Sequence, residues 1–417
     1  MITTLPSKTG SASSPAHAPM GFVEFVGMVA GLMALNALAV DVMLPALQEI
    51  GAALDVADEN DRQGVLSAYL LGFGAGQLFI GSVSDRFGRR SVLFWGLALY
   101  VVAAVACTVA PSFEALLAAR ALQGVASAAP RVITTSVVRD CYDGRQMARV
   151  MSLAMTVFIA VPVLAPSIGQ AVILFAPWRA IFALLTFYGL LMLLWTALRL
   201  PETLPSNRRR PIAPGAVAAA FRDILATPQT LGYALAGGMM FGAMFGFLLS
   251  AQQVFTQIFA LGPSFPLAFA AVALMMSLSS FLNARLVGRL GMRFISHGAV
   301  VAFTGLSAIM ALLARLDLLS FAPFMALLAG VMFLVGLIFS NFNALAMEPQ
   351  GHVAGTASSL IGSVTTLVVT AIGTAVGQAY DGSLVPLTTG YLGFGLASLS
   401  ILAATERGQL FGAGKRQ

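Results

Sequence analysis

Charged residues are scarce in this chain of 417 residues, and so are the residue types that build metal sites and disulfides. Asp, Glu, Lys and Arg make up 10% of the sequence, whereas a soluble domain carries about 25% because its surface must be solvated. The two cysteines, Cys107 in an apolar stretch and Cys141 in a loop, have neither disulfide nor metal spacing, so we expect inert thiols. The histidines are scattered, which argues against a metal site: His17, His297 and His352.

The motifs of enzymes and of ATP-driven machines are also missing. No Gly-x-Ser-x-Gly motif and no His/Asp/Glu constellation is present, so we expect a protein that is not an enzyme. Neither Lys8 nor Lys415 lies in a phosphate-binding loop, and no soluble domain is present to hold one, which argues against an ATP-driven pump. The net charge is +6, but the basic residues are spread over short loops, so we expect no nucleic-acid partner.

Apolar sequence, in contrast, is abundant. Hydrophobic residues make up 58% of the chain, and the mean hydropathy is +0.88. Twelve apolar stretches have about 20 residues, the length that crosses a hydrocarbon core of about 30 Å. Their approximate limits are 21–44, 63–82, 91–110, 113–137, 148–173, 177–198, 229–253, 265–284, 295–314, 320–343, 353–378 and 384–404. The sequence therefore predicts an all-α integral membrane protein with twelve transmembrane helices.

A basic segment between the second and third stretches recurs half a chain later. Gly81–Arg90 reads GSVSDRFGRR, and Ala284–Arg293 reads ARLVGRLGMR. When Gly88 is aligned with Gly291, 203 residues further on, two arginines of each segment coincide. Such a repeat indicates a duplicated bundle of membrane helices, which is how secondary transporters are built. The alternative is a chance similarity between two arginine-rich loops.

The placement of basic residues predicts the orientation and the organisation. With both termini in the cytoplasm, 18 of the 23 Lys and Arg residues fall in cytoplasmic segments, and three fall outside. The apolar stretch before Ala37 is too long for the core of a signal peptide, so we expect it to remain as the first span. The predicted parts are a disordered cytoplasmic tail (1–20), a six-helix bundle (21–198), a cytoplasmic linker (199–228) with a short amphipathic helix at 216–225, a second six-helix bundle (229–405) and a cytoplasmic tail (406–417).

Apart from charges in the first three residues of a span, four charged residues fall inside the predicted spans, all in the first half: Glu24, Asp41, Arg120 and Arg131. Each costs at least ~2.5–3.5 kcal/mol at mid-membrane, so each is a functional candidate. Glu24 begins its span and is expected at the cytoplasmic interface; its part in proton coupling stays open. Asp41 and Arg120 are expected at similar depth, where they could offset each other's burial. They are the candidate proton-coupling pair, and the alternative is a static ion pair that fixes the bundle.

The coupling hypothesis for Asp41 follows from its expected surroundings. Burial favours the neutral form of a carboxyl group, whereas the nearby Arg120 would favour the charged form. Opening the site to water on one side and then on the other changes that balance, so the group could take up a proton outside and release it inside. A substrate that competes with the proton or with Arg120 would complete the exchange.

A polar stripe along the fourth span predicts a water-filled cavity. Arg120 and Arg131 are 11 residues apart, which leaves about 20° of rotation between them on a helix. In the second half, amides, thioethers and aromatic rings suit a pocket for varied apolar compounds; the alternative for each is plain packing or contact with lipid. The candidate cavity residues are Gln123, Ser127, Arg131, Met239, Phe241, Phe245, Gln252 and Asn341.

Four motifs stand in order along the chain: Asp41–Leu47, Gly81–Arg90, Arg120–Gly124 with Arg139 and Asp140 after it, and Ala165–Gln170 with Trp178–Phe182 after it. Together they resemble the major facilitator superfamily, and within it the bicyclomycin/chloramphenicol-resistance (Bcr/CflA-type) drug:proton antiporters. The resemblance extends over 21–405 and implies two six-helix bundles that alternate access around a central cavity. It also implies a place in the bacterial inner membrane.

Two of these motifs imply conformational roles. The loop motif would act as a latch through Gly81, Asp85, Arg86, Gly88, Arg89 and Arg90, although plain positive-inside topology is the alternative for the arginines. The fifth-span antiporter motif would kink its helix through Pro162, Pro166 and Gly169. Ala165 and Gln170 stand where that motif normally has glycines, so the seal between the halves is expected to be looser.

The sequence therefore predicts a secondary transporter that exports small amphipathic drugs in exchange for protons. The alternatives are proton-coupled uptake of a small metabolite, since the same fold serves both directions, and, less favoured, an integral-membrane enzyme. We expect a monomer in the lipid bilayer, with protons and an amphipathic small molecule as partners. We expect no cofactor, because the proton gradient would supply the driving force.

Overall fold

The computed structural model describes residues 20–209, 215, 219, 222 and 225–411, and every regular element in this part of the chain is helical. The expectation of an all-α protein is confirmed. The long helices are α1 (Phe22–Asp41), α3 (Gly64–Phe87), α4 (Arg89–Thr108), α5 (Phe113–Cys141), α6 (Gly144–Phe175), α7 (Arg179–Arg199), α9 (Pro228–Gln253), α10 (Phe265–Leu290), α11 (Met292–Arg315), α12 (Phe321–Met347), α13 (Ala354–Gln378) and α14 (Val385–Thr405). Each predicted span corresponds to one of them, with limits that agree within six residues.

By length and composition, eleven helices of the described chain are apolar enough to cross a membrane. The twelfth long helix, α5, falls short because its 29 residues include Glu114, Arg120, Arg131 and Arg139. It nevertheless packs against both α3 and α4 in the middle of the first half. A helix enclosed by its neighbours does not need an apolar outer surface, so α5 completes the twelve.

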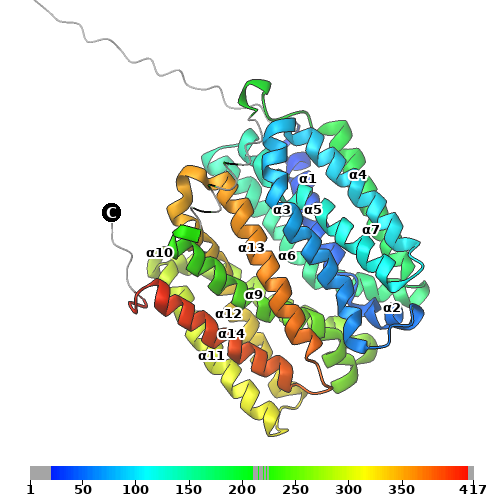
Figure 1. Cartoon of the computed structure of the whole chain (residues 1–417), viewed down its shortest axis with the longest axis vertical. Helices are drawn as coiled ribbons and strands as arrows, with labels where there is room; N and C mark the ends of the chain where they lie inside the picture. Colours follow the sequence, from blue (N-terminus) through cyan, green and yellow to red (C-terminus); the bar gives the residue numbers. More distant parts are fainter. Residues whose placement is uncertain (1–19, 210–214, 216–218, 220–221, 223–224, 412–417) are drawn as a thin grey trace, which may run out of the picture.

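The helices form two groups that lie side by side (Figure 1). Helices α1 to α7 pack mainly among themselves, and so do α9 to α14. The two groups meet where α3 lies against α13 and where α6 lies against α10. Figure 1 shows α3 and α13 together at the centre of the molecule. Residues 1–19 of the first expected tail, residues 412–417 of the second, and most of the expected linker helix at 216–225 lie outside the described residues.

Successive helices run in opposite directions, so the molecule has two ends. We call the end at which α1 begins and α14 ends the termini face, and the other end the opposite face. The turns at Gly88 and Gly291 lie at the termini face, where both glycines have positive φ angles, 97° and 81°. The short helix α2 (Leu47–Ala53) and the 3-10 segments η1 (Leu44–Ala46) and η2 (Glu59–Gln63) lie toward the opposite face.

Glycines bring helix backbones close together within each half. In the first half, a Cβ atom on Gly124 of α5 would lie 1.9 Å from the Tyr69 carbonyl oxygen of α3. In the second half, Gly238, Gly242 and Gly246 of α9 face side chains of α13, and a Cβ on Gly238 would lie 2.8 Å from Cγ1 of Val368. Small residues allow such contacts between membrane helices, but only the first-half contact is backbone against backbone.

Candidate functional site

Arg120 ties three helices together in the interior of the first half. Its side chain is fully buried, and its guanidinium donates to the carbonyl oxygens of Val65 on α3 (3.0 Å) and Ala39 on α1 (3.1 Å), and to Oε1 of Gln123 (2.7 Å). The guanidinium carbon also lies 4.4 Å from the centre of the Tyr69 ring. This buried cation is therefore satisfied by uncharged partners.

The Ala39 carbonyl is free to accept this bond because α1 ends nearby. In a continuous helix the amide of Met43 would donate to Ala39; here it donates to Val40 instead (3.4 Å). The last carbonyls of a helix need partners from elsewhere, and a cation at that end also interacts favourably with the helix dipole. Arg120 thus caps the C-terminal end of α1.

Asp41 is the last residue of α1 and is 6% exposed. Its side chain makes no hydrogen bond or ion pair with any other described residue. The sequence-based pairing with Arg120 is therefore absent from this conformation, although the contact between Arg120 and Ala39 places the two residues at similar depth, as expected. A buried carboxylate without a partner is costly, whereas its protonated form is tolerated.

The antiporter motif packs against the break that follows Asp41. Both Pro162 and Pro166 lie inside α6, which continues as one helix past them. A Cβ on Gly169 would lie 2.1 Å from the carbonyl oxygen of Val42 and 2.9 Å from Cγ of Pro45. Only glycine allows α6 to approach the break this closely, so the motif and the candidate carboxylate belong to one structural unit.

The other candidate cavity residues differ in burial and in hydrogen-bond partners. Five are buried: Gln123, Ser127, Phe245, Gln252 and Asn341. Of these, Asn341 exchanges hydrogen bonds with Asn283 (2.8 and 3.4 Å). The partly exposed ones are Arg131, Met239 and Phe241. Phe241 of α9 packs against Phe339 of α12 with ring centres 3.9 Å apart and the rings tilted by 38°. Arg131 makes no hydrogen bond, ion pair or ring contact with the described residues.

A network of side-chain amides joins the halves at the opposite face. Asn60 donates to the carbonyl oxygens of Gln378 (3.1 Å) and Tyr380 (2.9 Å), and Gln378 donates back to the Asn60 carbonyl (2.9 Å). Gln63 and Gln253 are hydrogen-bonded across the same boundary (2.8 Å), and Gln253 also donates to Asn60 (2.8 Å). We call these five residues the amide seal.

Further links continue the boundary between α3 and α13. The hydroxyls of Ser67 and Thr374 lie 2.7 Å apart, and Ser363 donates to the carbonyl oxygen of Gly74 (2.6 Å). Gln252, a candidate cavity residue, instead reaches Gln48 near α2 (3.3 Å). Nothing in the sequence indicated the amide seal, because single amides at the ends of helices form no recognisable motif.

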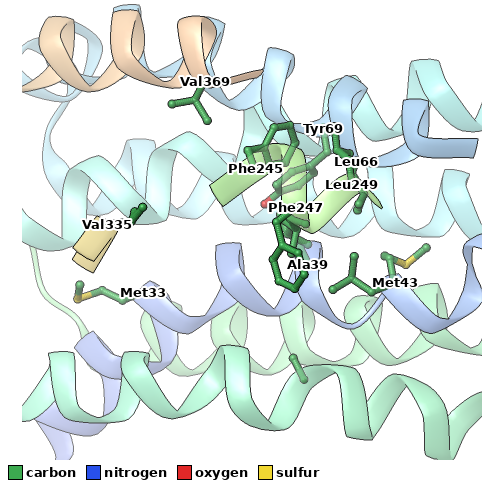
Figure 2. Close-up of a cluster of buried hydrophobic side chains, with 14 of the residues drawn as sticks. Met33, Ala39, Met43, Leu66, Tyr69, Phe245, Phe247, Leu249, Val335 and Val369 are labelled. Carbon is green, nitrogen blue, oxygen red and sulfur yellow. The ribbon is translucent and has the colours of Figure 1, made fainter. Parts of the chain in front are cut away.

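Beneath the amide seal, apolar side chains from both halves fill the centre of the molecule. Figure 2 shows Leu66 and Tyr69 of α3 beside Phe245, Phe247 and Leu249 of α9. All five are buried. The opposite face is therefore closed by a polar layer with an apolar layer under it.

The loop motif forms a charge cluster that stays within the first half. Arg89 is buried and pairs with Asp85 (2.6 Å) and Asp140 (3.2 Å), while its backbone amide donates to Glu202 (2.8 Å). The adjoining Arg90 donates to the Ala197 carbonyl at the end of α7 (2.7 Å).

The remaining latch candidates differ in their surroundings. Arg86 is exposed and lies over the Phe87 ring. Gly81 is the one nearest the other half, since a Cβ there would lie 3.0 Å from Oγ of Ser359. In this conformation none of the described ion pairs of the loop crosses between the halves.

The second half repeats this arrangement with other partners. Arg293 pairs with Glu406 after α14 (3.0 Å) and with Glu348 (3.5 Å). Tyr233 donates to Glu406 (2.5 Å), and its hydroxyl lies 3.0 Å from Nε2 of the buried His297.

Glu24 lies at the termini face, where it makes a two-pronged ion pair with Arg199 (2.6 and 2.8 Å). Its side chain is 28% exposed, as expected of a charge at the end of a span. Among the described residues, no group of His, Cys, Asp and Glu side chains could hold a metal ion.

Comparison with known proteins matches this architecture. The sequence profile of the Major Facilitator Superfamily matches residues 27–374. Among solved structures, a peptide transporter crystallised with sulfate superposes with a TM-score of 0.74 at 15% identity, covering 95% of this chain and 98% of that one. The xylose transporter XylE from E. coli, in a partially occluded inward-open conformation, gives 0.69 at 13% identity, with 92% and 97% covered.

Curated sequences are more similar. An uncharacterised MFS-type transporter of Bacillus subtilis, YdgK, is 32% identical, covering 84% of this chain and 87% of its own. A bicyclomycin resistance protein homolog of Haemophilus influenzae is 33% identical, covering 85% and 89%. The multidrug resistance protein MdtL of Escherichia coli is 35% identical over 42% of this chain and 45% of its own. The profile and the relatives place the protein in the bacterial inner membrane as a multi-span transporter, and the chain belongs to the Major Facilitator Superfamily.

Proposed function

We propose that the protein is a drug:proton antiporter that exports small amphipathic compounds across the bacterial inner membrane. The observation that carries this proposal is Asp41, a buried carboxyl group without a partner at the point where α1 breaks. The names of two relatives, a bicyclomycin resistance protein homolog and a multidrug resistance protein, support drugs as the cargo.

The proposed orientation has the termini face in the cytoplasm. The turns at that face carry Arg86, Arg89, Arg90, Arg289 and Arg293, as the positive-inside rule expects of cytoplasmic loops. Every hydrogen bond that joins the halves of the described chain involves residues 48–77 and 252–380, at the opposite face or mid-depth. The structure then corresponds to a state closed to the outside.

In the proposed cycle, Asp41 is the proton carrier. When the amide seal opens, water from outside reaches the α1 break, and the carboxyl group takes up a proton. After the outside closes, the group releases the proton toward the cytoplasm, as arriving substrate favours its charged form. Arg120 holds the break in place through uncharged acceptors, so it positions Asp41 without neutralising it. Since one chain holds both halves, we propose that a monomer suffices.

The direction of exchange is tested in inside-out membrane vesicles acidified by respiration. For an antiporter, adding a phenicol, bicyclomycin or a dye should release protons from the vesicle lumen, which a fluorescent pH indicator records. Proton-coupled uptake would leave the lumen more acidic or unchanged. Resistance of a transporter-deficient bacterium to the same compounds identifies the cargo.

The role of Asp41 is tested in the same vesicles. Asp41→Asn should reach the membrane in normal amounts, yet lose proton-driven efflux, while passive exchange of substrate down its gradient persists. Asp143→Asn, which changes an exposed carboxyl group at the termini face, serves as the matched control and should behave as wild type. Proton-dependent efflux by Asp41→Asn at the wild-type rate would show that the coupling group lies elsewhere, with Glu24 the next candidate.

A further inference from the structure

The two arginines inside α5 have opposite surroundings. Arg120 is fully buried, with three hydrogen bonds and an aromatic ring around its guanidinium. Arg131, on the same stripe of the helix, has no partner of any of these kinds in the described chain. Its side chain is also only partly buried. Arg131 is therefore a partly open cation whose donors are unused within the described chain.

Among the described residues, no carboxyl group pairs with Arg131 in this conformation. Asp41 lies near the level of Arg120, as the contact between Arg120 and Ala39 shows. Eleven residues of helix separate Arg120 from Arg131, a rise of about 16 Å toward the termini face. Two carboxyl groups that lie toward the termini face of the first half each already have a partner: Asp140 pairs with Arg89, and Glu24 pairs with Arg199. An isolated cation at this depth is costly unless something pairs with it.

We infer that Arg131 binds an acidic group of the transported compound, so that the cargo is an amphipathic acid or zwitterion. A guanidinium presents donors in a fork that matches the two oxygens of a carboxylate. Unlike Arg120, whose donors are used within the protein, Arg131 has all of its donors available. This inference rests on the proposed transport function and names the substrate class within it.

The second half supplies the complementary apolar surface at matching depth. Helices α5 and α12 both begin at the opposite face, at Phe113 and Phe321. Arg131 and Phe339 each lie 18 residues further on, so both sit about 27 Å along their helices. Phe339 is 39% exposed and packs against Phe241 of α9. A compound with one acidic end and an aromatic or aliphatic body would match these two chemistries.

The inference is tested by equilibrium binding to the purified full-length protein in detergent, with dansyl-phenylalanine and its neutral amide as probes. The two differ only in the acidic group, and dansyl fluorescence reports binding. Wild type should bind the acid about 10-fold or more tightly than the amide, a difference of about 1.4 kcal/mol. Arg131→Gln should bind both equally, and Arg131→Lys should retain part of the preference. Arg315→Gln, at an exposed arginine at the end of α11, is the control and should bind as wild type.

The outcomes separate this inference from the proposed function. Three results would overturn it. Wild type could bind acid and amide equally, the acid preference could survive in Arg131→Gln, or wild type could bind neither probe. Because binding in detergent involves no proton gradient, an acid preference that depends on Arg131 would stand even if drug-driven proton release failed. Conversely, proton-coupled efflux without an acid preference would retain the antiporter and discard the acidic substrate.

Discussion

The two halves of the molecule are braced in the same way at the termini face, but they differ in the charged residues of their interiors. At the termini face, Gly88 and Gly291 make equivalent turns, and the arginine two positions later contacts the last helix of its own half. Arg90 donates to Ala197 at the end of α7, and Arg293 pairs with Glu406 just after α14. The echo in the sequence is therefore a repeated brace within each bundle.

The chemical difference lies in the membrane interior. The first half holds Asp41, Arg120 and Arg131, whereas the polar centre of the second half is a neutral pair, Asn283 and Asn341. Equivalent braces combined with unequal interiors suggest a division of labour: each half moves as a unit, and the first half carries the charges that respond to protons and cargo.

Among the substitutions that compare the halves, we expect Arg120→Lys to reduce transport most. Lysine keeps the charge but cannot hold acceptors on three helices at once, because its ammonium is a single point. We expect transport to fall about 10-fold or more, which corresponds to about 1.4 kcal/mol, together with a lower melting temperature. Transport in vesicles and thermal unfolding in detergent measure the two effects.

The matched second-half change is Asn341→Ala. It should destabilise the protein by about 1–3 kcal/mol, since Asn283 loses its partner, while the proton dependence of transport stays normal.

If Arg120→Lys transported as well as wild type, the role of Arg120 would be purely electrostatic and would not depend on its hydrogen bonds to several helices.

Gly124→Ala and Gly238→Ala compare the packing of the halves. The new methyl group at Gly124 meets backbone at 1.9 Å, whereas at Gly238 it meets the Val368 side chain at 2.8 Å. Backbone cannot move aside as a side chain can, so we expect a loss of about 3 kcal/mol for the first and under about 1 kcal/mol for the second. Melting temperatures in one detergent decide the order. Equal losses would mean that α3 and α5 can separate as readily as α9 and α13.

Arg89→Gln and Arg293→Gln compare the two charge clusters. The Arg89 side chain is 6% exposed and holds the ends of α3 and α5 together, whereas the Arg293 side chain is 17% exposed. We expect about 2 kcal/mol of destabilisation for the first and about 1 kcal/mol for the second. Chemical denaturation in mixed micelles provides the measurement, and a larger loss at Arg293 would contradict the ranking.

The smallest expected effect is a pH dependence in the second half. Burial raises the pKa of the Glu406 carboxyl, but hydrogen bonds from Tyr233 and Arg293 outweigh it and hold the pKa below its usual 4.5. Because the folded pKa is the lower one, the stabilisation is present above about pH 4.5 and is lost as the pH falls through the folded value. The melting temperature should drop less between pH 6 and pH 4 for Glu406→Gln than for wild type. The exposed Asp143→Asn control should follow wild type, and identical drops in all three would rule out this contribution.

The sequence predicted the helices well because their signal is local. Each span needs only about 20 apolar residues, and even α5, the most polar, was found from its apolar stretches. The depth of Asp41 and Arg120 was also predictable, since it depends on counting residues along helices.

The partners of those residues were not predictable, because they depend on tertiary contacts with groups that carry no signal. Arg120 binds carbonyl oxygens of Ala39 and Val65, and every residue has a carbonyl. Asp85 was expected to belong to a latch, but its partner in this conformation, Arg89 one helical turn away, could not be named from the sequence. The amide seal depends on the meeting of η2 with the end of α13, more than 300 residues apart in sequence.

The chemistry of the amide seal determines how far salt and pH affect the closure of the opposite face. Asn60, Gln63, Gln253 and Gln378 do not ionise, and their hydrogen bonds are screened little by dissolved ions, unlike exposed ion pairs. On the proposed orientation this closure faces a compartment whose salinity and acidity follow the surrounding medium. The amide seal itself would therefore shut much alike in fresh water, brine or acid. The hydrogen bond from Gln257 to Glu59 is the one link between the halves of the described chain that holds an ionisable group.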